Sequence, residues 1–302
     1  MSLFDAGEGF ECKPIPGRPK IELDRNQRQK LDRMINNKVF CGYRAVGRKF
    51  GCDEKTAKRI VKEVGYKILT RKNCPKSTPE QAQRQKTRTR KLRYAAKGKT
   101  LVLDDESYFD LDGHSFFGGK KFACKSIENV PPEIQFRQKK KFGGKLLVWI
   151  AISAKGHSAP YFHECYGAIN QKIYRDECLK RLYPFIKSHG KIQTLFWPDL
   201  ASSHYAKSVL EDLERNGVHY VTKEINPPNV PQLRPIEVFW SHLKRKVYSG
   251  GFMAENRESL IKKINKELKT FGKKDFESLM KNLKSKIIKA DRDGVNSVIV
   301  HS

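Results

Sequence analysis

The sequence predicts an α/β protein in which a mixed sheet flanked by helices follows a small all-α domain. Two observations carry this prediction. Residues 1–99 hold 27 Lys and Arg against 10 Asp and Glu, and their apolar residues recur at helical spacing. The remainder alternates short apolar runs with amphipathic segments, as in layered sheets and helices. We therefore divide the chain into a tail (1–23), a helical domain (24–66), a basic linker and helix (67–98) and an α/β domain (99–302).

The charge balance restricts the partners of the protein. The 302 residues carry a formal net charge of +28, yet 38% of them are hydrophobic, which excludes a disordered basic tail. Such a surface favours a polyanion, and a packing protein that coats phosphate fits the charge as well. The chain shows no secretory signal and no apolar run of the ~20 residues that cross a bilayer, so no membrane partner is expected. Its seven cysteines form no C-x-x-C pair, so neither disulfides nor a zinc cluster is predicted.

The helical domain has the spacing of a helix-turn-helix. Helices are expected over 25–36, 43–51 and 52–62, with Asp53 as the N-cap of the third. The third helix would read DNA. Its outward basic side chains are Lys55, Lys58, Arg59 and Lys62, over a core of Ala45, Val46, Phe50, Ala57, Ile60 and Val61. The alternative is a three-helix packing module with a solvated basic face.

Two more basic segments flank this domain. Arg18 and Lys20 belong to a Pro-Gly-Arg-Pro-Lys turn, which predicts an extended arm in an A·T-rich minor groove or, alternatively, a basic linker. Residues 80–96 predict an arginine-rich helix. Such a helix follows a phosphate backbone, serves as a nuclear address, or is only a solvated charged surface.

The α/β domain begins with a short strand. Strands are predicted over 100–103, 145–152 and 192–197, and additional ones near 116–124, 158–162 and 218–221. Helices are predicted over 170–188 and 203–216. Pro235 opens a last helix, whose apolar face comprises Ile236, Phe239, Trp240, Leu243 and Val247.

Carboxylates follow two of these strands. The first apolar run stops at Asp104-Asp105-Glu106, the run 192–197 leads to Asp199, and Glu237 lies in the first turn of the last helix. Sites in α/β folds gather outside the carboxyl ends of strands. Oxygen ligands of this kind suit Mg²⁺ or Mn²⁺, and two such ions ~4 Å apart serve phosphodiester chemistry. Taken singly, each carboxylate also fits a structural role as a cap or turn residue.

Three strings around these acids resemble the catalytic motifs of the Tc/mariner superfamily of DNA transposases. The Pro-x-x-x-Pro-Ile-Glu-x-x-Trp pattern of the third is the most specific, and the resemblance covers about residues 16–250. The strings are Leu103-Asp104-Asp105-Glu106-Ser107, Trp197-Pro198-Asp199-Leu200-Ala201-Ser202-Ser203-His204 and Asn229-Val230-Pro231-Gln232-Leu233-Arg234-Pro235-Ile236-Glu237-Val238-Phe239-Trp240.

The resemblance implies an RNase H-like core with a DDE-type triad that binds two Mg²⁺ or Mn²⁺ ions. It places the triad at Asp105, with Asp104 as a neighbour easily confused with it, Asp199 and Glu237. There are 37 residues between the last two acids. His204 matches a recurrent motif histidine and is expected to support the site. The implied activity is cut-and-paste transposition in the nucleus: a homodimer cleaves double-stranded DNA at terminal inverted repeats, and the freed 3′-hydroxyl attacks target DNA.

The sequence departs from the family pattern in two places. Arg234 stands where relatives usually have Asn. Relatives also usually carry another helix-turn-helix before the Gly-Arg-Pro segment, and we expect this chain to lack it. Two alternative functions remain: a domesticated or inactive transposase-derived, sequence-specific DNA-binding protein, and a nuclease of the same fold without strand transfer.

Overall fold

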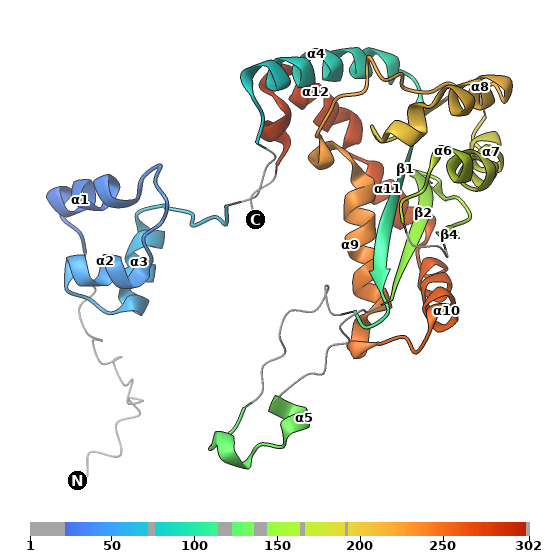
Figure 1. Cartoon of the computed structure of the whole chain (residues 1–302). Helices are drawn as coiled ribbons and strands as arrows, with labels where there is room; N and C mark the ends of the chain where they lie inside the picture. The colour runs from blue at the N-terminus through green and yellow to red at the C-terminus, as the bar shows by residue number, and fades with distance from the viewer. Residues whose placement is uncertain are drawn as a thin grey trace, which may run out of the picture. The chain divides into compact units, whose positions relative to one another are not determined.

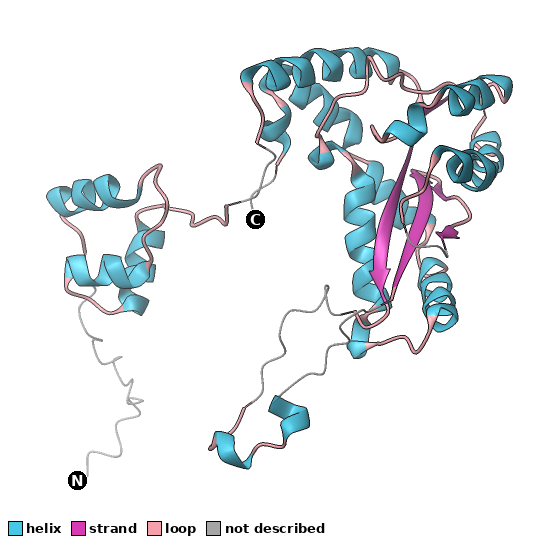
Figure 2. Cartoon of the chain, in the orientation of Figure 1, coloured by secondary structure: helices cyan, strands magenta, loops and turns pink. Residues whose placement is uncertain are grey.

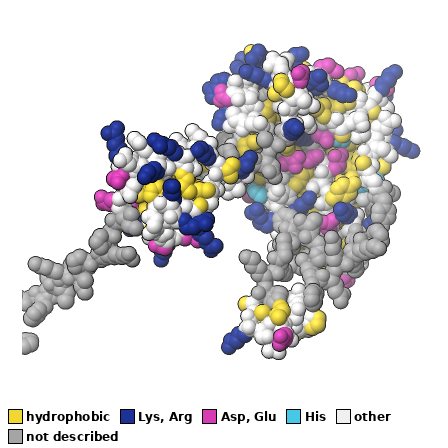
Figure 3. All heavy atoms as spheres, turned by 60° about the vertical axis from the view of Figure 1, so that its left-hand side comes forward, with side chains coloured by type: hydrophobic (Ala, Val, Ile, Leu, Met, Phe, Trp, Pro, Cys, Tyr) yellow, Lys and Arg dark blue, Asp and Glu magenta, His cyan; other side chains and the backbone are white. Residues whose placement is uncertain are grey.

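The structure is a computed structural model that describes residues 22–71, 76–113, 123–135, 144–163, 167–190 and 193–299. The chain forms two compact units, Met1–Lys72 with His301–Ser302, and Asn73–Val300 (Figure 1). The predicted basic segment Arg18–Lys20 lies outside the described residues. Lys and Arg side chains cover much of the outer surface of each unit in the view of Figure 3, and a group of Asp and Glu side chains lies on one face of the second unit.

The first unit contains the three predicted helices, α1 (Arg25–Ile35), α2 (Tyr43–Phe50) and α3 (Glu54–Glu63). Their shared core includes six buried side chains, Leu31, Ile35, Val46, Ala57, Ile60 and Val61. Ala45 and Phe50, also expected there, are only partly buried.

The turn between α2 and α3 depends on two glycines. Gly51 ends α2 in the left-handed conformation (φ 64°), which favours glycine. A Cβ on Gly47 would lie 2.5 Å from the carbonyl oxygen of Cys52, so the close approach of the two helices requires a glycine there. Asp53 caps α3 by accepting from the backbone N–H groups of Lys55 (2.8 Å) and Thr56 (3.0 Å).

The second unit is a mixed sheet covered by helices (Figure 2). Its strands are β1 (Thr100–Asp110), β2 (Lys145–Ser153), β3 (Gly156–His157), β4 (Tyr161–His163) and β5 (Thr194–Trp197). Its helices are α4 (Pro79–Ala95), α5 (Pro132–Gln135), α6 (Gln171–Ile173), a π-helical turn (Tyr174–Leu179), α7 (Lys180–Lys187), α8 (Lys207–Arg215), α9 (Pro235–Val247), α10 (Arg257–Leu268), α11 (Lys273–Met280) and α12 (Leu283–Asp293).

The strand order is β3-β2-β1-β5, with β4 paired to β2. β1 is antiparallel to β2 and parallel to β5. The prediction that the first strand stops at Asp104 is wrong, because β1 continues to Asp110. The reason is non-local: β2 pairs with β1 from Leu103 to Asp110, so the polar residues of β1 remain in the sheet.

Two other predicted strands differ from the structure, and a third lies almost wholly outside the described residues. Of the segment 116–124 only Ala123 and Cys124 are described, and they lie in a loop. The segment 218–221 contributes a single bridge, between Phe196 and Tyr220, instead of a strand. The segment 158–162 becomes a strand only at its end, in β4.

Helices cover both faces of the sheet. On one face, inward residues of β1 and β2 pack against α9, α10 and α11. On the other, residues of β1, β2 and β5 pack against α8 and the α6–α7 segment. A third cluster joins α4 and α12 to the β1–β5 edge. Trp149 and Trp197 are completely buried in this layered core.

α4 belongs to the second unit, although the sequence analysis placed it in a linker. Leu92 is buried against α12, and Arg90 and Arg93 pair with the buried Asp291 of that helix at 3.1 and 2.8 Å. Figure 1 shows α4 lying along α12. The inward face of α4 is made of Gln85, Thr89 and Leu92, two of them polar, so its hydrophobic periodicity is weak.

The sequence predicts no membrane span and no disulfide, and the described residues bear on both points. None of their helices has the length and apolarity that a membrane span requires. Four cysteines in this part of the chain, Cys41, Cys52, Cys124 and Cys178, are free thiols.

Candidate active site

Asp105 and Asp199 meet where β1 and β5 separate. The parallel pairing of these strands ends at Leu103 opposite Trp197, and each Asp follows its strand position by two residues. Because the two strands run in the same direction, both carboxylates emerge at the same edge of the sheet. The structure therefore brings together the first two acids that the sequence singled out.

A third acid, Glu106, joins them. One carboxylate oxygen from each of Asp105, Glu106 and Asp199 lies within 4.8 Å of the others, and all three residues are partly buried. Carboxylate oxygens at this spacing suit the hard ions Mg²⁺ and Mn²⁺. The donor set fits such an ion.

Glu237 does not belong to this group of three. It lies in the first turn of α9, where the predicted apolar residues of that helix are buried, and its own side chain is exposed. Its negative charge nevertheless reaches Asp105, whose pKa it helps to raise. The structure thus places Glu237 beside the group without placing its carboxylate among the three oxygens.

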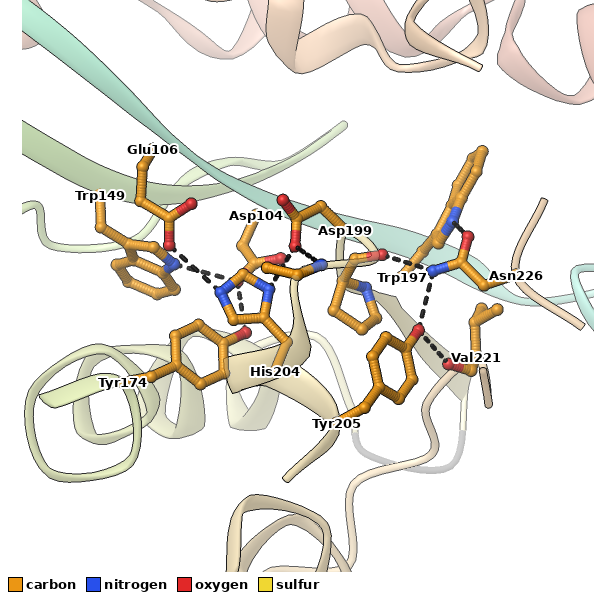
Figure 4. A network of polar contacts seen from close by, with 12 residues as sticks. Asp104, Glu106, Trp149, Tyr174, Trp197, Asp199, His204, Tyr205, Val221 and Asn226 are labelled. Atoms are coloured by element: carbon orange, nitrogen blue, oxygen red, sulfur yellow. Dashed lines mark hydrogen bonds and ion pairs between the residues drawn. The ribbon is translucent and has the colours of Figure 1, made fainter. Parts of the chain in front are cut away.

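Asp104 and Asp105 occupy different environments. Asp104 is completely buried and accepts hydrogen bonds from Trp149 Nε1 (3.0 Å) and Tyr174 Oη (2.5 Å) (Figure 4). Asp105 accepts from Trp240 Nε1 of α9 at 3.1 Å. Successive residues of a strand point to opposite faces, which separates the two carboxylates. Asp104 is held inside the core, and Asp105 is the one in the acidic group.

His204 bridges two of the three acids. Its Nδ1 lies 2.5 Å from Asp199 Oδ1 and its Nε2 lies 3.2 Å from Glu106 Oε1, as Figure 4 shows. The ring stacks on Tyr174 with the centroids 3.8 Å apart. Burial alone would lower the pKa of His204, but hydrogen bonds with Asp199 and Glu106 raise it to about 10. The ring of His204 therefore contacts both acids at once.

The local fold explains the position of Tyr174. The predicted helix 170–188 is continuous, but residues Tyr174–Leu179 form a π-helical turn. Such turns recur at functional sites because the extra residue redirects a side chain. Here the turn begins at Tyr174, which contacts both Asp104 and His204.

Burial and neighbouring charges shift the pKa values of the carboxylates in the site. Burial raises the pKa of Asp105 to about 7, against the opposing positive charge of Arg234. The pKa of Asp104 rises to about 6, again chiefly through burial. For Asp199, burial acts upward, but the hydrogen bond and charge of His204 outweigh it and hold the pKa below its ordinary value. A divalent cation would relieve this repulsion.

Arg234 is a buried cation next to these acids. Its Nη2 donates to the carbonyl oxygen of Asp104 at 2.5 Å, and its Nη1 donates to that of Pro198 at 3.3 Å. From the sequence, Arg234 stood out only as a departure from the family pattern, and no role was expected for Glu106. No local pattern in the sequence pointed to the contacts of Glu106 or of Arg234.

The predicted DNA-reading residues lie on one helix of the first unit. Lys55, Lys58 and Lys62 are exposed on α3, opposite its buried residues. Arg59 is partly buried and lies 3.8 Å from Glu63. Three free cationic side chains thus extend along the outer face of α3.

The chain is related in sequence to known transposases. No protein-family model matches it. It is 24% identical to the Tc3 transposase of Caenorhabditis elegans over 202 residues, which cover 66% of this chain and 57% of the relative. It is 27% identical to the Tcb2 transposase of Caenorhabditis briggsae over 147 residues, 48% of this chain and 51% of the relative. The chain thus spans only a little over half the length of these relatives.

Solved structures give the same relationship. The Mos1 transposase paired-end complex with the left transposon end superposes with a TM-score of 0.66 at 14% identity, over 97% of this chain and 84% of that one. The isolated catalytic domain of the Mos1 mariner transposase gives a TM-score of 0.54 at 14% identity, over 74% of this chain and 98% of that one. The Mos1 paired-end complex with Mn gives 0.63 at 16% identity, over 97% and 85% of the two chains. The fold is that of the mariner transposases, with an RNase H-like mixed sheet.

Proposed function

We propose that this chain, which is related by sequence and by fold to the Tc/mariner transposases, is a divalent-metal-dependent, cut-and-paste DNA transposase. The observation that carries the proposal is the meeting of Asp105, Glu106 and Asp199 within 4.8 Å at the edge where β1 and β5 separate. An acidic group at this edge of a transposase fold is suited to phosphodiester chemistry. The Mos1 structures with Mn and with Mg support divalent-ion use.

The proposed ligands are Asp105, Asp199 and Glu237, with two Mg²⁺ or Mn²⁺ ions between them. Bound ions would activate the attacking water or 3′-hydroxyl and stabilise the leaving oxygen. The exposed side chain of Glu237 is free to turn toward Asp105 once a cation offsets their repulsion. The imidazole ring of His204 contacts both Glu106 and Asp199. Glu106 therefore orients Asp199 through this ring.

The protein supplies the remaining steps through its own residues. Trp240 fixes the carboxylate of Asp105, and His204 fixes that of Asp199. Lys55, Lys58 and Lys62 of α3, together with Arg18 and Lys20, would bind the DNA of the terminal inverted repeats by neutralising phosphates. Mos1 is known as a paired-end complex and as a strand transfer complex, which supports action on two DNA ends by a homodimer. We also propose the nucleus as the place of this activity.

An assay of strand transfer tests the proposal. Purified protein is incubated with labelled inverted-repeat duplex, target plasmid and Mg²⁺, and joined products are counted against a sample with EDTA. The proposal requires metal-dependent joining, and joining that falls sharply in Glu237→Gln. Nicking without joining would favour a nuclease of the same fold. Binding without either reaction would favour a DNA-binding protein derived from a transposase.

A further inference from the structure

Arg234 contacts all three elements that carry the proposed ligands. Its side chain reaches β1 and the end of β5, and its main chain begins α9. We propose that Arg234 is a positioning residue that sets the separation of Asp105 and Asp199 and thereby the fit of the site to Mg²⁺. This inference rests on the metal site of the proposed function.

The first contact of Arg234 replaces sheet pairing that the sequence cannot provide. β1 and β5 pair as far as Leu103 and Trp197, and the residue that follows β5 is Pro198, which has no N–H to donate. The guanidinium of Arg234 supplies hydrogen bonds at this point. It donates to Asp104 O at 2.5 Å, to Pro198 O at 3.3 Å and to Trp197 O at 3.5 Å. One side chain thus joins the two strands just before each continues to its Asp.

The second contact of Arg234 reaches the helix that carries Glu237. Arg234 is the N-cap residue of α9, with extended backbone angles (φ −104°, ψ 99°). Its carbonyl oxygen accepts the N–H of Glu237 at 3.2 Å. Residue 234 therefore carries, on one backbone, both the guanidinium that joins the strands and the start of α9.

The surroundings of Arg234 make this connection rigid. Arg234 is only 8% exposed, and its Cζ lies 5.6 Å from the centre of the Trp197 ring. Arginine suits this position because its planar group holds several donors in a fixed fork. Lysine would keep the charge and lose the fork. The substitution Arg234→Lys therefore separates geometry from charge.

The choice of metal ion provides a readout of geometry. Mg²⁺ requires near-ideal octahedral coordination, whereas Ca²⁺ accepts six to eight oxygens in flexible arrangements. If Arg234 fixes the spacing of the acids, its loss should weaken Mg²⁺ binding more than Ca²⁺ binding. A residue that only stabilises the fold would leave the ratio of the two affinities unchanged.

Arg88 of α4 offers a matched control. Its Nη1 donates to the carbonyl oxygens of Lys223 (2.9 Å) and Asn226 (3.1 Å), so it too joins backbone carbonyls through a guanidinium. Neither carbonyl belongs to a residue next to a proposed ligand, whereas Arg234 contacts the neighbours of Asp105 and Asp199. Arg88→Lys should therefore reduce stability without changing the Mg²⁺ to Ca²⁺ ratio.

The experiment measures Mg²⁺ and Ca²⁺ affinities by calorimetry for the full chain and for Arg234→Lys, Arg234→Gln and Arg88→Lys. We expect Arg234→Lys to weaken Mg²⁺ binding by ~10–100-fold, the usual effect of losing an outer-shell partner, and Ca²⁺ binding less. Circular dichroism identifies variants that fold, and Arg234→Gln, whose amide still donates, substitutes for a lysine variant that does not.

The outcomes separate the two proposals. If the unmodified chain binds neither ion, the metal site fails and this inference fails with it. If the chain binds Mg²⁺ and a folded Arg234 variant keeps its affinity and its Mg²⁺ to Ca²⁺ ratio, the positioning role is wrong while the metal site stands. Tighter Mg²⁺ binding by Arg234→Gln would also overturn it, since the charge would then outweigh the geometry.

Discussion

Trp240 Nε1 donates a hydrogen bond of 3.1 Å to Asp105 Oδ2, and this bond connects α9 to the central strand of the sheet. The same helix carries Glu237 in its first turn, one turn before Trp240. The bond therefore ties the position of the first proposed ligand to the helix that carries the third. Asp105 and Trp240 belong to two separate sequence motifs, which only the resemblance to transposases had connected.

Replacing this tryptophan should affect metal binding as well as stability. Trp240→Phe keeps an aromatic ring in the core but removes the hydrogen bond to Asp105, which is worth about 1.5–3 kcal/mol for a charged acceptor. We expect a lower free energy of unfolding and weaker Mg²⁺ binding. Chemical denaturation and calorimetry measure the two effects. Trp149→Phe is the control, because its bond goes to Asp104. If both variants bind Mg²⁺ equally well, the link between Trp240 and the site is wrong.

Asp105→Asn should stabilise the metal-free protein at high pH. The pKa of Asp105 is raised from 3.8 to about 7, so the folded state holds the proton more tightly than the unfolded state. The resulting stability is complete below about pH 4 and disappears as the pH rises through 7. The variant, which has no charge to bury, should melt higher than the unmodified chain at pH 8 in EDTA, with little difference at pH 4. Added Mg²⁺ should raise the melting temperature of the unmodified chain only. A lower melting temperature for the variant at pH 8 would contradict this account.

His204→Asn should reveal a contribution that is also lost as the pH rises, but over a higher pH range. The folded pKa of His204 is about 10, above the ordinary value of 6.5, so its contribution is complete below pH 6.5 and is lost as the pH rises through 10. The stability difference between the unmodified chain and the variant should therefore be largest below pH 6.5 and shrink toward pH 10. Denaturation in EDTA at four pH values measures it. A difference that grows with pH would show that His204 is neutral in the folded protein.

α4 should depend on one buried carboxylate. Asp291 is 4% exposed and pairs with Arg90 and Arg93, whose side chains are 58% and 42% exposed. Asp291→Asn should cost about 1–3 kcal/mol, because the arginines can return to water. Hydrogen exchange should increase in α4 more than in α9. Unchanged protection of α4 would mean that the apolar contacts of Leu92 hold it alone.

The lysines of α3 should contribute to DNA affinity through phosphates. Lys55→Ala, Lys58→Ala and Lys62→Ala together remove three exposed charges from one face. If each contacts a phosphate, the slope of log K against log salt should become smaller by about 0.9 per lysine. The exposed Lys30 of α1 provides the control variant. An unchanged slope in the triple variant would remove α3 from the DNA-binding surface.

The sequence predicted most of the elements that position the site. β5, α9 and the three helices of the first unit follow from apolar periodicity, a first-turn proline and an N-cap. These are local signals. The apolar strands pointed to Asp104-Asp105-Glu106 and to Asp199, and the resemblance selected Asp105; Asp105 and Asp199 do lie together.

What the sequence missed depends on pairing between distant segments. β1 extends to Asp110 because β2 supplies its partner, which the composition of residues 104–110 does not reveal. The helix over residues 80–96 was predicted, but its place in the second unit was not, because its inward face is mostly polar and Arg90 and Arg93 pair with Asp291, some 200 residues later. The hydrogen bond between His204 and Glu106 joins residues 98 positions apart in the sequence. The two side chains meet only because of the register of the sheet.

The central claim is that Asp105 and Asp199 form a divalent-metal site that cleaves DNA. The most direct test measures Mn²⁺-dependent nicking of labelled inverted-repeat duplex by the unmodified chain and by Asp199→Asn, which keeps the size of the side chain and removes its charge. The account predicts nicking by the unmodified chain that EDTA abolishes, and a loss in the variant larger than the ~10–100-fold typical of outer-shell changes. Equal nicking by the two proteins would contradict it.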